Sequence, residues 1–253
     1  MDEEPLQTSH PQLDRVRHSL AGARRVTVLT GAGVSAASGV PTFRGAGGLW
    51  RNRQAQQLAT PEAFGQDPAL VWEWYAWRRQ VIAGCEPNAA HHTIARWSER
   101  PGFTLVTQNV DGLHERAGTR GVIRYHGSIW RLQCTGAETA GGAHPAEWED
   151  LRVPLDPLPP NCPHCGALAR PAVVWFGEAI PPAAAARAAQ AASSCDVFLS
   201  IGTSAVVYPA AGLVAEARAH GAFTVEINPE TTPAAVDVAL PMPAEVALPL
   251  LDR

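Results

Sequence analysis

Short apolar runs rich in β-branched residues recur along the chain and alternate with stretches of helical periodicity. Five such runs predict buried parallel strands, because strands covered on both faces carry few polar positions: 24–30, 103–107, 122–126, 196–201 and 223–227. Five other segments predict helices: 34–38, 61–83, 87–100, 182–193 and 213–220. This alternation indicates an α/β fold built on a Rossmann-like, doubly wound parallel sheet.

The stretch 131–170 breaks the alternation, because it has no long apolar run and holds three of the five cysteines. Its many prolines and glycines predict a small inserted module, of the zinc-ribbon type. A second, helical insertion is expected at 45–86. The parallel-sheet domain is then expected to comprise 12–44, 87–130 and 171–253, with the proline-rich tail from residue 231 wrapping the surface.

Composition excludes several classes of protein. With 253 residues, 46% hydrophobic and 17% charged, the chain can bury a sizeable core. A net charge of −4 provides no basic surface for nucleic acid. No apolar run approaches the roughly 20 residues that span a bilayer, so no membrane partner is expected. The N-terminus is acidic and lacks an apolar core, which predicts a cytoplasmic location. An odd number of cysteines argues against a disulfide framework.

A glycine-rich turn follows the first predicted strand. Gly31, Gly33 and Ala36 fit the pattern G-x-G-x-x-G/A, in which glycines permit a tight turn and a helix N-terminus faces a pyrophosphate. Dehydrogenases with this pattern also carry an acid about 20 residues later, which binds a ribose hydroxyl. Residues 45–61 contain neither Asp nor Glu, so the turn predicts a dinucleotide site of another geometry.

Four segments together resemble the motifs of the sirtuins, the NAD-dependent protein deacylases. Residues 31–44 (GAGVSAASGVPTFR) resemble the family's signature, and 107–114 (TQNVDGLH) resemble its second motif. His126-Gly127 matches the catalytic histidine, while 202–204 (GTS) and Asn228 match the adenosine side. The resemblance runs from about residue 20 to about 230, in the family's order, and implies NAD as cofactor.

The resemblance also implies a mechanism and the residues that carry it. An acyl-lysine amide oxygen attacks the nicotinamide ribose, nicotinamide leaves, and His126 acts as general base on a ribose hydroxyl. Histidine suits this task because its ordinary pKa, about 6.5, lies near neutral pH. Asn109 and Asp111 would complete the catalytic set by positioning the nicotinamide carboxamide. The implied cofactor contacts are Gly31, Ala32, Gly33, Ser35, Phe43, Arg44, Gln108, Asn109, Asp111, Gly202, Thr203, Ser204 and Asn228.

The substrates implied are acylated lysine side chains of other proteins, bound by a monomer. Residues 174–178, with Val174, Trp175 and Phe176, and residues 206–209 resemble the segments between which the substrate adds as a strand. Tyr75 and Arg78, three residues apart on a predicted helix, resemble the Tyr-x-x-Arg element of class III sirtuins, which prefer succinyl-, malonyl- or glutaryl-lysine. A plain deacetylase, a mono-ADP-ribosyltransferase and a non-catalytic NAD-sensing protein are the alternatives.

The cysteines of the inserted module form an incomplete zinc pattern. Cys162 and Cys165 make a C-x-x-C pair, and Cys134 precedes it by 28 residues. Sirtuins carry two such pairs, but Ala137 stands here where the fourth cysteine is expected. Either His144 or His164 completes a structural zinc site, or the module has lost its metal.

Overall fold

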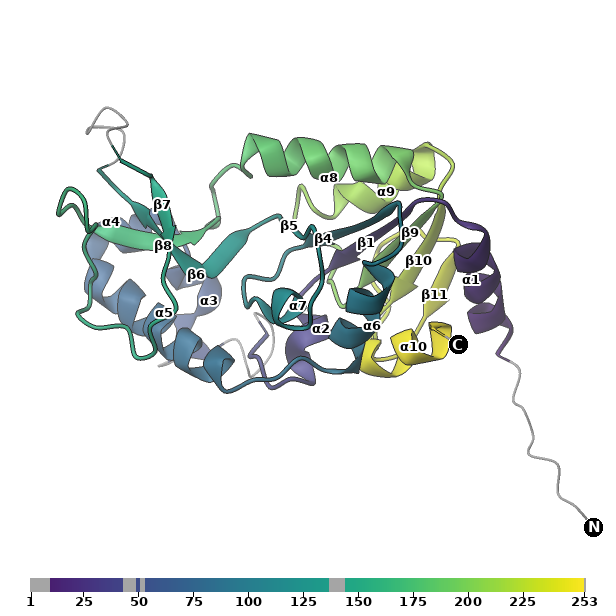
Figure 1. The fold of residues 1–253 in the computed structure, drawn as a ribbon, viewed down its shortest axis with the longest axis horizontal. Helices are drawn as coiled ribbons and strands as arrows, with labels where there is room; N and C mark the ends of the chain where they lie inside the picture. The colour runs from purple at the N-terminus through teal and green to yellow at the C-terminus, as the bar shows by residue number, and fades with distance from the viewer. Residues whose placement is uncertain (1–9, 43–48, 51–52, 137–143, 253) are drawn as a thin grey trace, which may run out of the picture.

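A parallel sheet of six strands forms the larger part of the molecule (Figure 1). The computed structural model describes residues 10–42, 49–50, 53–136 and 144–252. The strand order is β11-β10-β9-β1-β4-β5, and every neighbouring pair is parallel. The strands are β1 (Val26–Thr30), β4 (Phe103–Thr107), β5 (Ile123–Arg124), β9 (Val197–Ile201), β10 (Phe223–Ile227) and β11 (Val238–Leu240). The predicted Rossmann-like sheet is therefore confirmed, with β5 shorter than expected.

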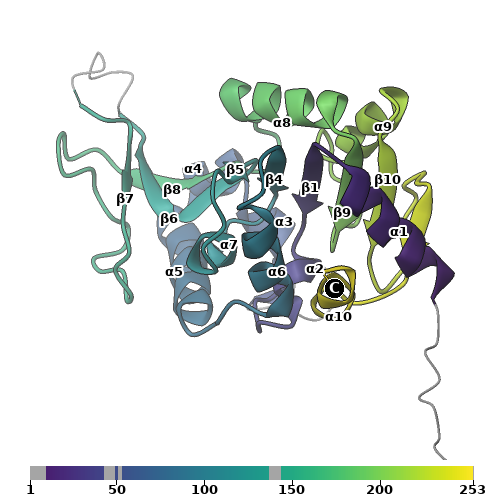
Figure 2. The ribbon, with the colours of Figure 1, turned by 45° about the vertical axis from the view of Figure 1, so that its right-hand side comes forward.

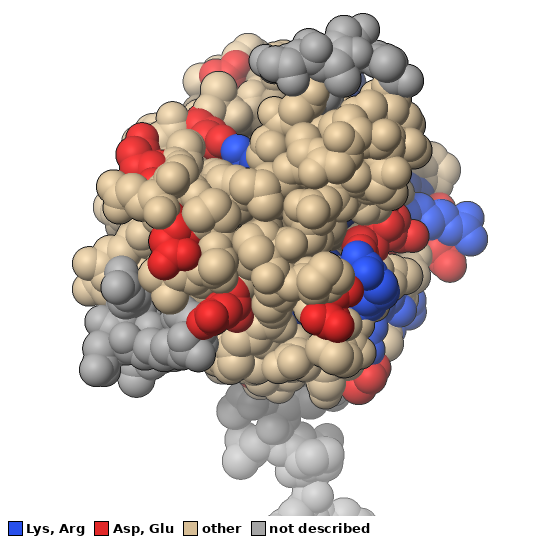
Figure 3. Space-filling view, turned by 90° about the vertical axis from the view of Figure 1, so that its left-hand side faces the viewer, with Lys and Arg blue, Asp and Glu red and all other residues tan. Residues whose placement is uncertain are grey.

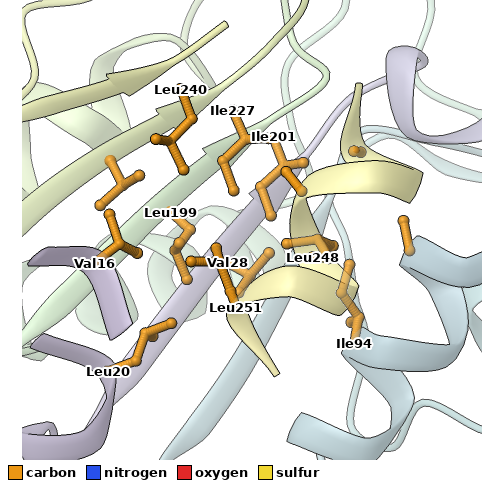
Figure 4. Close-up of a cluster of buried hydrophobic side chains, with 14 of the residues drawn as sticks. Val16, Leu20, Val28, Ile94, Leu199, Ile201, Ile227, Leu240, Leu248 and Leu251 are labelled. Carbon is orange, nitrogen blue, oxygen red and sulfur yellow. The ribbon is translucent and has the colours of Figure 1, made fainter. Parts of the chain in front are cut away.

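Helices cover both faces of this sheet (Figures 1 and 2). On one face lie α8 (Pro182–Ser194) and α9 (Gly212–Ala219), and on the other lie α1 (Pro11–Gly22), α6 (Ala89–Trp97) and α10 (Ala244–Leu251). Side chains alternate along a strand, so Val28 packs toward the α1, α6 and α10 face whereas Leu29 packs toward the other. Figure 4 shows the first of these cores, where Leu248 and Leu251 of α10 meet the sheet.

A smaller lobe lies beside the sheet domain and holds both insertions (Figure 1). It contains an antiparallel sheet of β6 (Gly127–Cys134), β7 (Glu147–Glu149) and β8 (Ala169–Val173), in the order β7-β6-β8. Its helices are α3 (Ala55–Leu58), α4 (Pro61–Gln66) and α5 (Pro68–Ala83). Residues of these helices and strands share one hydrophobic core. The helical insertion and the cysteine-containing module therefore pack together, and the division of the chain at 130/131 and 170/171 stays a prediction.

Short elements lie on the chain between β1 and α3 and between β4 and β5. They are α2 (Gly33–Ala36), the hairpin of β2 (Leu49–Trp50) and β3 (Arg53–Gln54), and α7 (Leu113–Arg116). The helix expected over 61–83 is divided into α4 and α5 at Asp67, because the residue before Pro68 is disfavoured in helical conformation. Asp67 instead accepts a hydrogen bond from the Leu70 N–H at 2.9 Å and caps α5.

The tail does not wrap the surface as the sequence led us to expect. It supplies β11, the edge strand beside β10, and α10, whose side chains are buried against α6 and the sheet. Packing of Leu248 and Leu251 stabilises this helix although Pro249 lies inside it. The helix α1 was not predicted, although its buried residues Leu13, Val16 and Leu20 follow helical spacing.

The outer end of the smaller lobe presents mainly uncharged surface with scattered carboxylates (Figure 3). The exposed large apolar side chains among the described residues of the lobe include Leu151, Val153, Leu158 and Leu168. Among the described residues, no helix has the length and apolar character needed to cross a membrane.

Candidate active site

One continuous cleft of about 890 Å³ lies between the sheet domain and the smaller lobe. The sheet side is lined by the residues that follow the carboxyl ends of β1, β4, β9 and β10, which is where open α/β sheets bind ligands. The lobe side is lined by residues of α5, of the segment before α4, and of the segment after β8. Most of the described residues that were predicted to bind the nucleotide and the acyl-lysine therefore line one cavity.

The glycine-rich turns after β1 and β9 touch each other at the base of this cleft. The Gly33 N–H donates to the Gly202 carbonyl oxygen at 2.8 Å. A Cβ on Gly33 would lie 2.8 Å from Gly202, and one on Gly202 would lie 2.5 Å from the Val34 nitrogen. Gly202 also has a φ of +59°, which residues with a side chain rarely adopt. Glycines at these positions allow two strand ends to approach closely and leave backbone exposed to a ligand; Ala32 lines the cleft beside them.

His126 lines the cleft opposite these turns and is held in one tautomer. Its Nδ1 lies 3.2 Å from the Gln108 carbonyl oxygen, which can only accept a hydrogen bond. Nδ1 must therefore carry the hydrogen, so the lone pair is on Nε2. Burial lowers the pKa of His126 below its ordinary value, and the Gln108 carbonyl opposes part of that shift. The imidazole is consequently neutral at pH 7, as a general base must be.

Asn109 reaches the cleft, whereas Asp111 and Ser35 lie behind it. The Asn109 side-chain amide donates to the Gly31 carbonyl at 3.1 Å and to Ser35 Oγ at 3.2 Å. Ser35 Oγ in turn donates to Asp111 Oδ2 at 2.8 Å. Asp111 is 4% exposed and Ser35 is fully buried, and neither belongs to the described lining. Their direct contact with NAD stays a prediction, and the structure gives them the role of holding Asn109.

His91 extends this buried network and was not singled out in the sequence. Its Nδ1 accepts the Asn88 N–H at 3.2 Å, so its Nε2 carries the hydrogen and faces Ser35 Oγ at 3.3 Å. Burial, the neighbouring His114 and then His92 lower the pKa of His91 to about 3. Burial likewise lowers the pKa of His114 to about 3. The neutral side chains of His91 and His114 therefore both support the turn after β1. This supporting role becomes visible only in the folded structure.

Four more of the predicted cofactor residues line the cleft, namely Gln108, Thr203, Ser204 and Asn228. The Gln108 side-chain amide donates to Thr203 Oγ1 at 3.0 Å, which joins the loops after β4 and β9. Ser204 lies beside them, and Asn228 follows β10 and donates to the Glu230 carbonyl at 2.8 Å. Phe43 and Arg44, which we expected to cover the cofactor, lie outside the described residues.

Tyr75 and Arg78 of α5 line the same cleft from the side of the smaller lobe. Both are buried, at 3% and 5% exposed, and both belong to its lining. Tyr75 Oη accepts the indole N–H of Trp175 at 2.9 Å, so its own hydrogen can be donated to a ligand. Burial lowers the pKa of Arg78, and the Tyr75 and Asp111 side chains oppose that shift. A buried guanidinium in a cleft wall is suited to an anionic ligand group.

The two segments between which we expect the substrate to bind also line the cleft. The Val174 N–H donates to the His126 carbonyl at 3.0 Å, and the Phe176 N–H donates to the Ala59 carbonyl at 2.9 Å. Phe176 is 42% exposed, whereas Tyr208 on the opposing segment is 77% exposed. Phe176 and Tyr208 thus border the opening on its two sides, and binding of a peptide strand between them stays a prediction.

The three cysteines of the inserted module gather with His144. Their sulfur atoms and a ring nitrogen of His144 all lie within 4.8 Å of one another, and Cys134 Sγ is 3.4 Å from Cys165 Sγ. His144 Nδ1 lies 2.9 Å from a carbonyl oxygen, so it carries the hydrogen, while the buried Nε2 has no hydrogen-bond partner within the described residues. Three thiols and this imidazole fit a closed structural zinc site.

His144, rather than His164, is therefore the histidine that completes the cluster. The His164 ring stacks on that of His144 with centroids 5.1 Å apart. Ala137 lies outside the described residues. A zinc ion in this position would be structural, because the four ligands leave no coordination position for a substrate.

Comparison with known proteins agrees with this geometry. The sequence profile described as the Sir2 family matches residues 31–209. A protein named NAD-dependent protein deacylase from Aquifex aeolicus is 49% identical over 209 residues, which cover 82% of this chain and 84% of that relative. The mitochondrial NAD-dependent protein deacylase sirtuin-5 of Canis lupus familiaris is 44% identical over 86% of this chain and 77% of its own length. A crystal structure of a Sir2 homologue with NAD superposes with a TM-score of 0.85 at 42% identity, covering 94% and 92% of the two chains.

Proposed function

Because this chain belongs to the Sir2 family, we propose that it is an NAD-dependent protein-lysine deacylase. It would transfer the acyl group from a lysine side chain of another protein to ADP-ribose and release nicotinamide. The observation that carries the proposal is the position of His126. His126, with its hydrogen held on Nδ1, lines the same cleft as the two touching glycine turns and the buried Arg78.

His126 and Asn109 have separate tasks in this reaction, and two residues behind Asn109 support it. Bound NAD supplies the ribose carbon from which nicotinamide departs. His126 removes a proton from a ribose hydroxyl through Nε2, because the Gln108 carbonyl holds its hydrogen on Nδ1. Asn109 directs both amide hydrogens inward to Gly31 and Ser35, so its side-chain oxygen can accept from the nicotinamide carboxamide. Asp111 and Ser35 fix that orientation from behind.

A nicotinamide-release assay separates this proposal from its alternatives. A deacylase releases nicotinamide only when an acyl-lysine peptide is present, and it forms one deacylated peptide for each nicotinamide. A mono-ADP-ribosyltransferase would release nicotinamide while adding mass to the acceptor protein, and would not need His126 as base. A non-catalytic NAD-binding protein would release none. Mass spectrometry of the peptide in the same reaction distinguishes the three results.

We further propose that the preferred substrates are succinyl- and malonyl-lysine, with weaker deacetylation. Each of these acyl groups ends in a carboxylate, and burying a carboxylate without a partner is costly. Arg78 offers a cation and Tyr75 a hydroxyl donor at the buried end of the cleft. A higher kcat/KM for a succinyl than for an acetyl peptide tests the proposal, and a preference for acetyl would favour the plain deacetylase.

We also propose that the cysteine cluster of the smaller lobe holds a structural zinc ion. Zinc held by Cys134, His144, Cys162 and Cys165 would brace the antiparallel sheet, since Cys134 ends β6 and the C-x-x-C pair precedes β8. The cytoplasmic location and the monomeric state stay predictions from the sequence.

A further inference from the structure

Trp175 lies between two polar residues of the smaller lobe that come from different elements. The Arg170 guanidinium, from β8, lies 3.5 Å from the centre of the Trp175 ring. The Trp175 indole nitrogen donates to Tyr75 Oη of α5 at 2.9 Å. The Phe64 ring packs against the same indole at 5.3 Å between centroids. Trp175 thus connects an arginine outside the cleft lining to the tyrosine at its acyl end.

Arg170 also fixes the backbone on which Trp175 is carried. Its guanidinium donates to both carboxylate oxygens of Glu178, at 2.6 and 2.8 Å, and to the Val173 carbonyl at 3.0 Å. Glu178 Oε2 accepts the Trp175 backbone N–H at 2.8 Å as well. The bidentate ion pair of Arg170 and Glu178 therefore closes the segment from β8 to Glu178 into a loop. Both side chains of the pair are largely buried, so solvent screens it less than a surface pair.

The charge state of Glu178 agrees with this arrangement. Burial by itself would raise the pKa of Glu178, but the hydrogen bonds and charge of Arg170 and the Trp175 N–H hold that pKa below its ordinary value. The carboxylate is thus ionised throughout the neutral range. Its hydrogen bond from the Trp175 N–H and its ion pair with Arg170 therefore do not depend on pH there.

We propose that Arg170 is a positioning residue for the acyl-binding end of the cleft. Its stack on Trp175 and its pair with Glu178 hold the indole N–H against Tyr75 Oη. A hydroxyl that accepts this hydrogen bond keeps its single hydrogen for the carboxylate of the acyl group. The inference rests on the proposed deacylase function and on the proposed role of Tyr75.

Two consequences distinguish this role from a merely structural one. Arg170 is not among the cleft-lining residues, so its loss should act through the affinity for an acidic acyl group more than through the chemical step. The KM for a succinyl peptide should then rise more than kcat falls. An acetyl group has no carboxylate to receive the Tyr75 hydrogen, so its kcat/KM should fall less. The Kd of NAD, whose predicted contacts lie mainly on the sheet side of the cleft, should stay within a factor of about two.

The experiment measures the ratio of kcat/KM for succinyl to acetyl peptides in four variants, with Arg78→Met as the reference for a lost acyl contact. Arg170→Gln should lower the ratio about fivefold, the size of one ordinary hydrogen bond. Trp175→Phe keeps a ring but removes the N–H and should lower the ratio similarly. Arg170→Lys should give a ratio between those of the wild type and Arg170→Gln. Its ammonium keeps the charge but neither stacks flat on an indole nor binds a carboxylate in a bidentate way. Arg96→Gln is the control, since it breaks an arginine–carboxylate pair with Asp252 outside the cleft and should leave the ratio unchanged.

The results that overturn the inference are separate from those that overturn the proposed function. If Arg78→Met lowers the ratio while Trp175→Phe and both Arg170 variants keep it within twofold, the positioning role is wrong and the function stands. Equal losses for both peptides would assign Arg170 to general stability and also reject the inference. If Arg170→Gln does not fold, Arg170→Lys and Trp175→Phe still decide. A wild-type chain without acyl-dependent nicotinamide release rejects the proposed function, and the inference with it.

Discussion

Replacing Arg78 with methionine tests the acyl preference, because it removes the charge at the buried end of the cleft and keeps most of the volume. Arg78 is 5% exposed, so its interaction with an acyl carboxylate would be weakly screened by water. A hydrogen bond to a charged group contributes about 1.5–3 kcal/mol. The kcat/KM for desuccinylation should therefore fall by roughly 10- to 150-fold, at about 1.4 kcal/mol for each factor of ten.

Deacetylation should change little or rise in the same variant, because an acetyl group does not use the charge and the pocket becomes more apolar. Tyr75→Phe is the matched companion, since it removes only a hydroxyl and should cost about 0.5–1.5 kcal/mol in desuccinylation. The two changes should not be additive, because both side chains would bind the same carboxylate. Steady-state kinetics on succinyl and acetyl peptides of one sequence measure all of this. If Arg78→Met lowers both activities equally, Arg78 is structural and the acyl-class reasoning is refuted.

Three other predictions concern the buried network, the cysteine cluster and the glycine turns. His91 and His114 have a pKa of about 3 in the folded chain and near 6.5 when unfolded, so the unfolded state takes up protons first. The free energy of unfolding, measured in urea, should thus fall by about 4 kcal/mol from pH 7 to 5, and a constant value would contradict this. Elemental analysis should find one zinc per chain, lost in His144→Ala and kept in His164→Ala; no zinc in the wild type would reject the cluster as a metal site. Gly202→Ala should weaken NAD binding at least tenfold and lower the Tm, because its Cβ would meet the Val34 nitrogen; binding near wild type would refute the close approach.

The hydrophobic pattern of the sequence predicts those elements whose local preference agrees with their tertiary contacts. The strands of the parallel sheet are continuous apolar runs because both their faces are buried, so β1, β4, β9 and β10 were predicted within two residues. The tail was misread because its prolines are typical of coil. There α10 gains its stability from contacts with α6 and the sheet, which propensity does not record.

The candidate site likewise has features that the sequence predicts and features that only the structure reveals. Motif strings located the cleft residues, such as His126 and Arg78, since each carries its own chemistry. The contacts that orient them could not be found from the sequence, even where both residues of a contact were predicted separately. His91 supports Ser35 from 56 positions away, and Tyr75 meets Trp175 across 100 positions. Such partners become visible only when the fold brings distant segments together, and a lone histidine or arginine gives no sign of its partner.

The central claim is that His126 is the general base of an NAD-dependent deacylation in this cleft. The most direct test compares wild type and His126→Ala for acyl-peptide-dependent nicotinamide release and peptide deacylation, together with the Kd of NAD. Deacylation should fall at least about 100-fold, the low end for a positioned general base, while the Kd of NAD changes only a few-fold. Deacylation by His126→Ala within a few-fold of wild type would contradict the account.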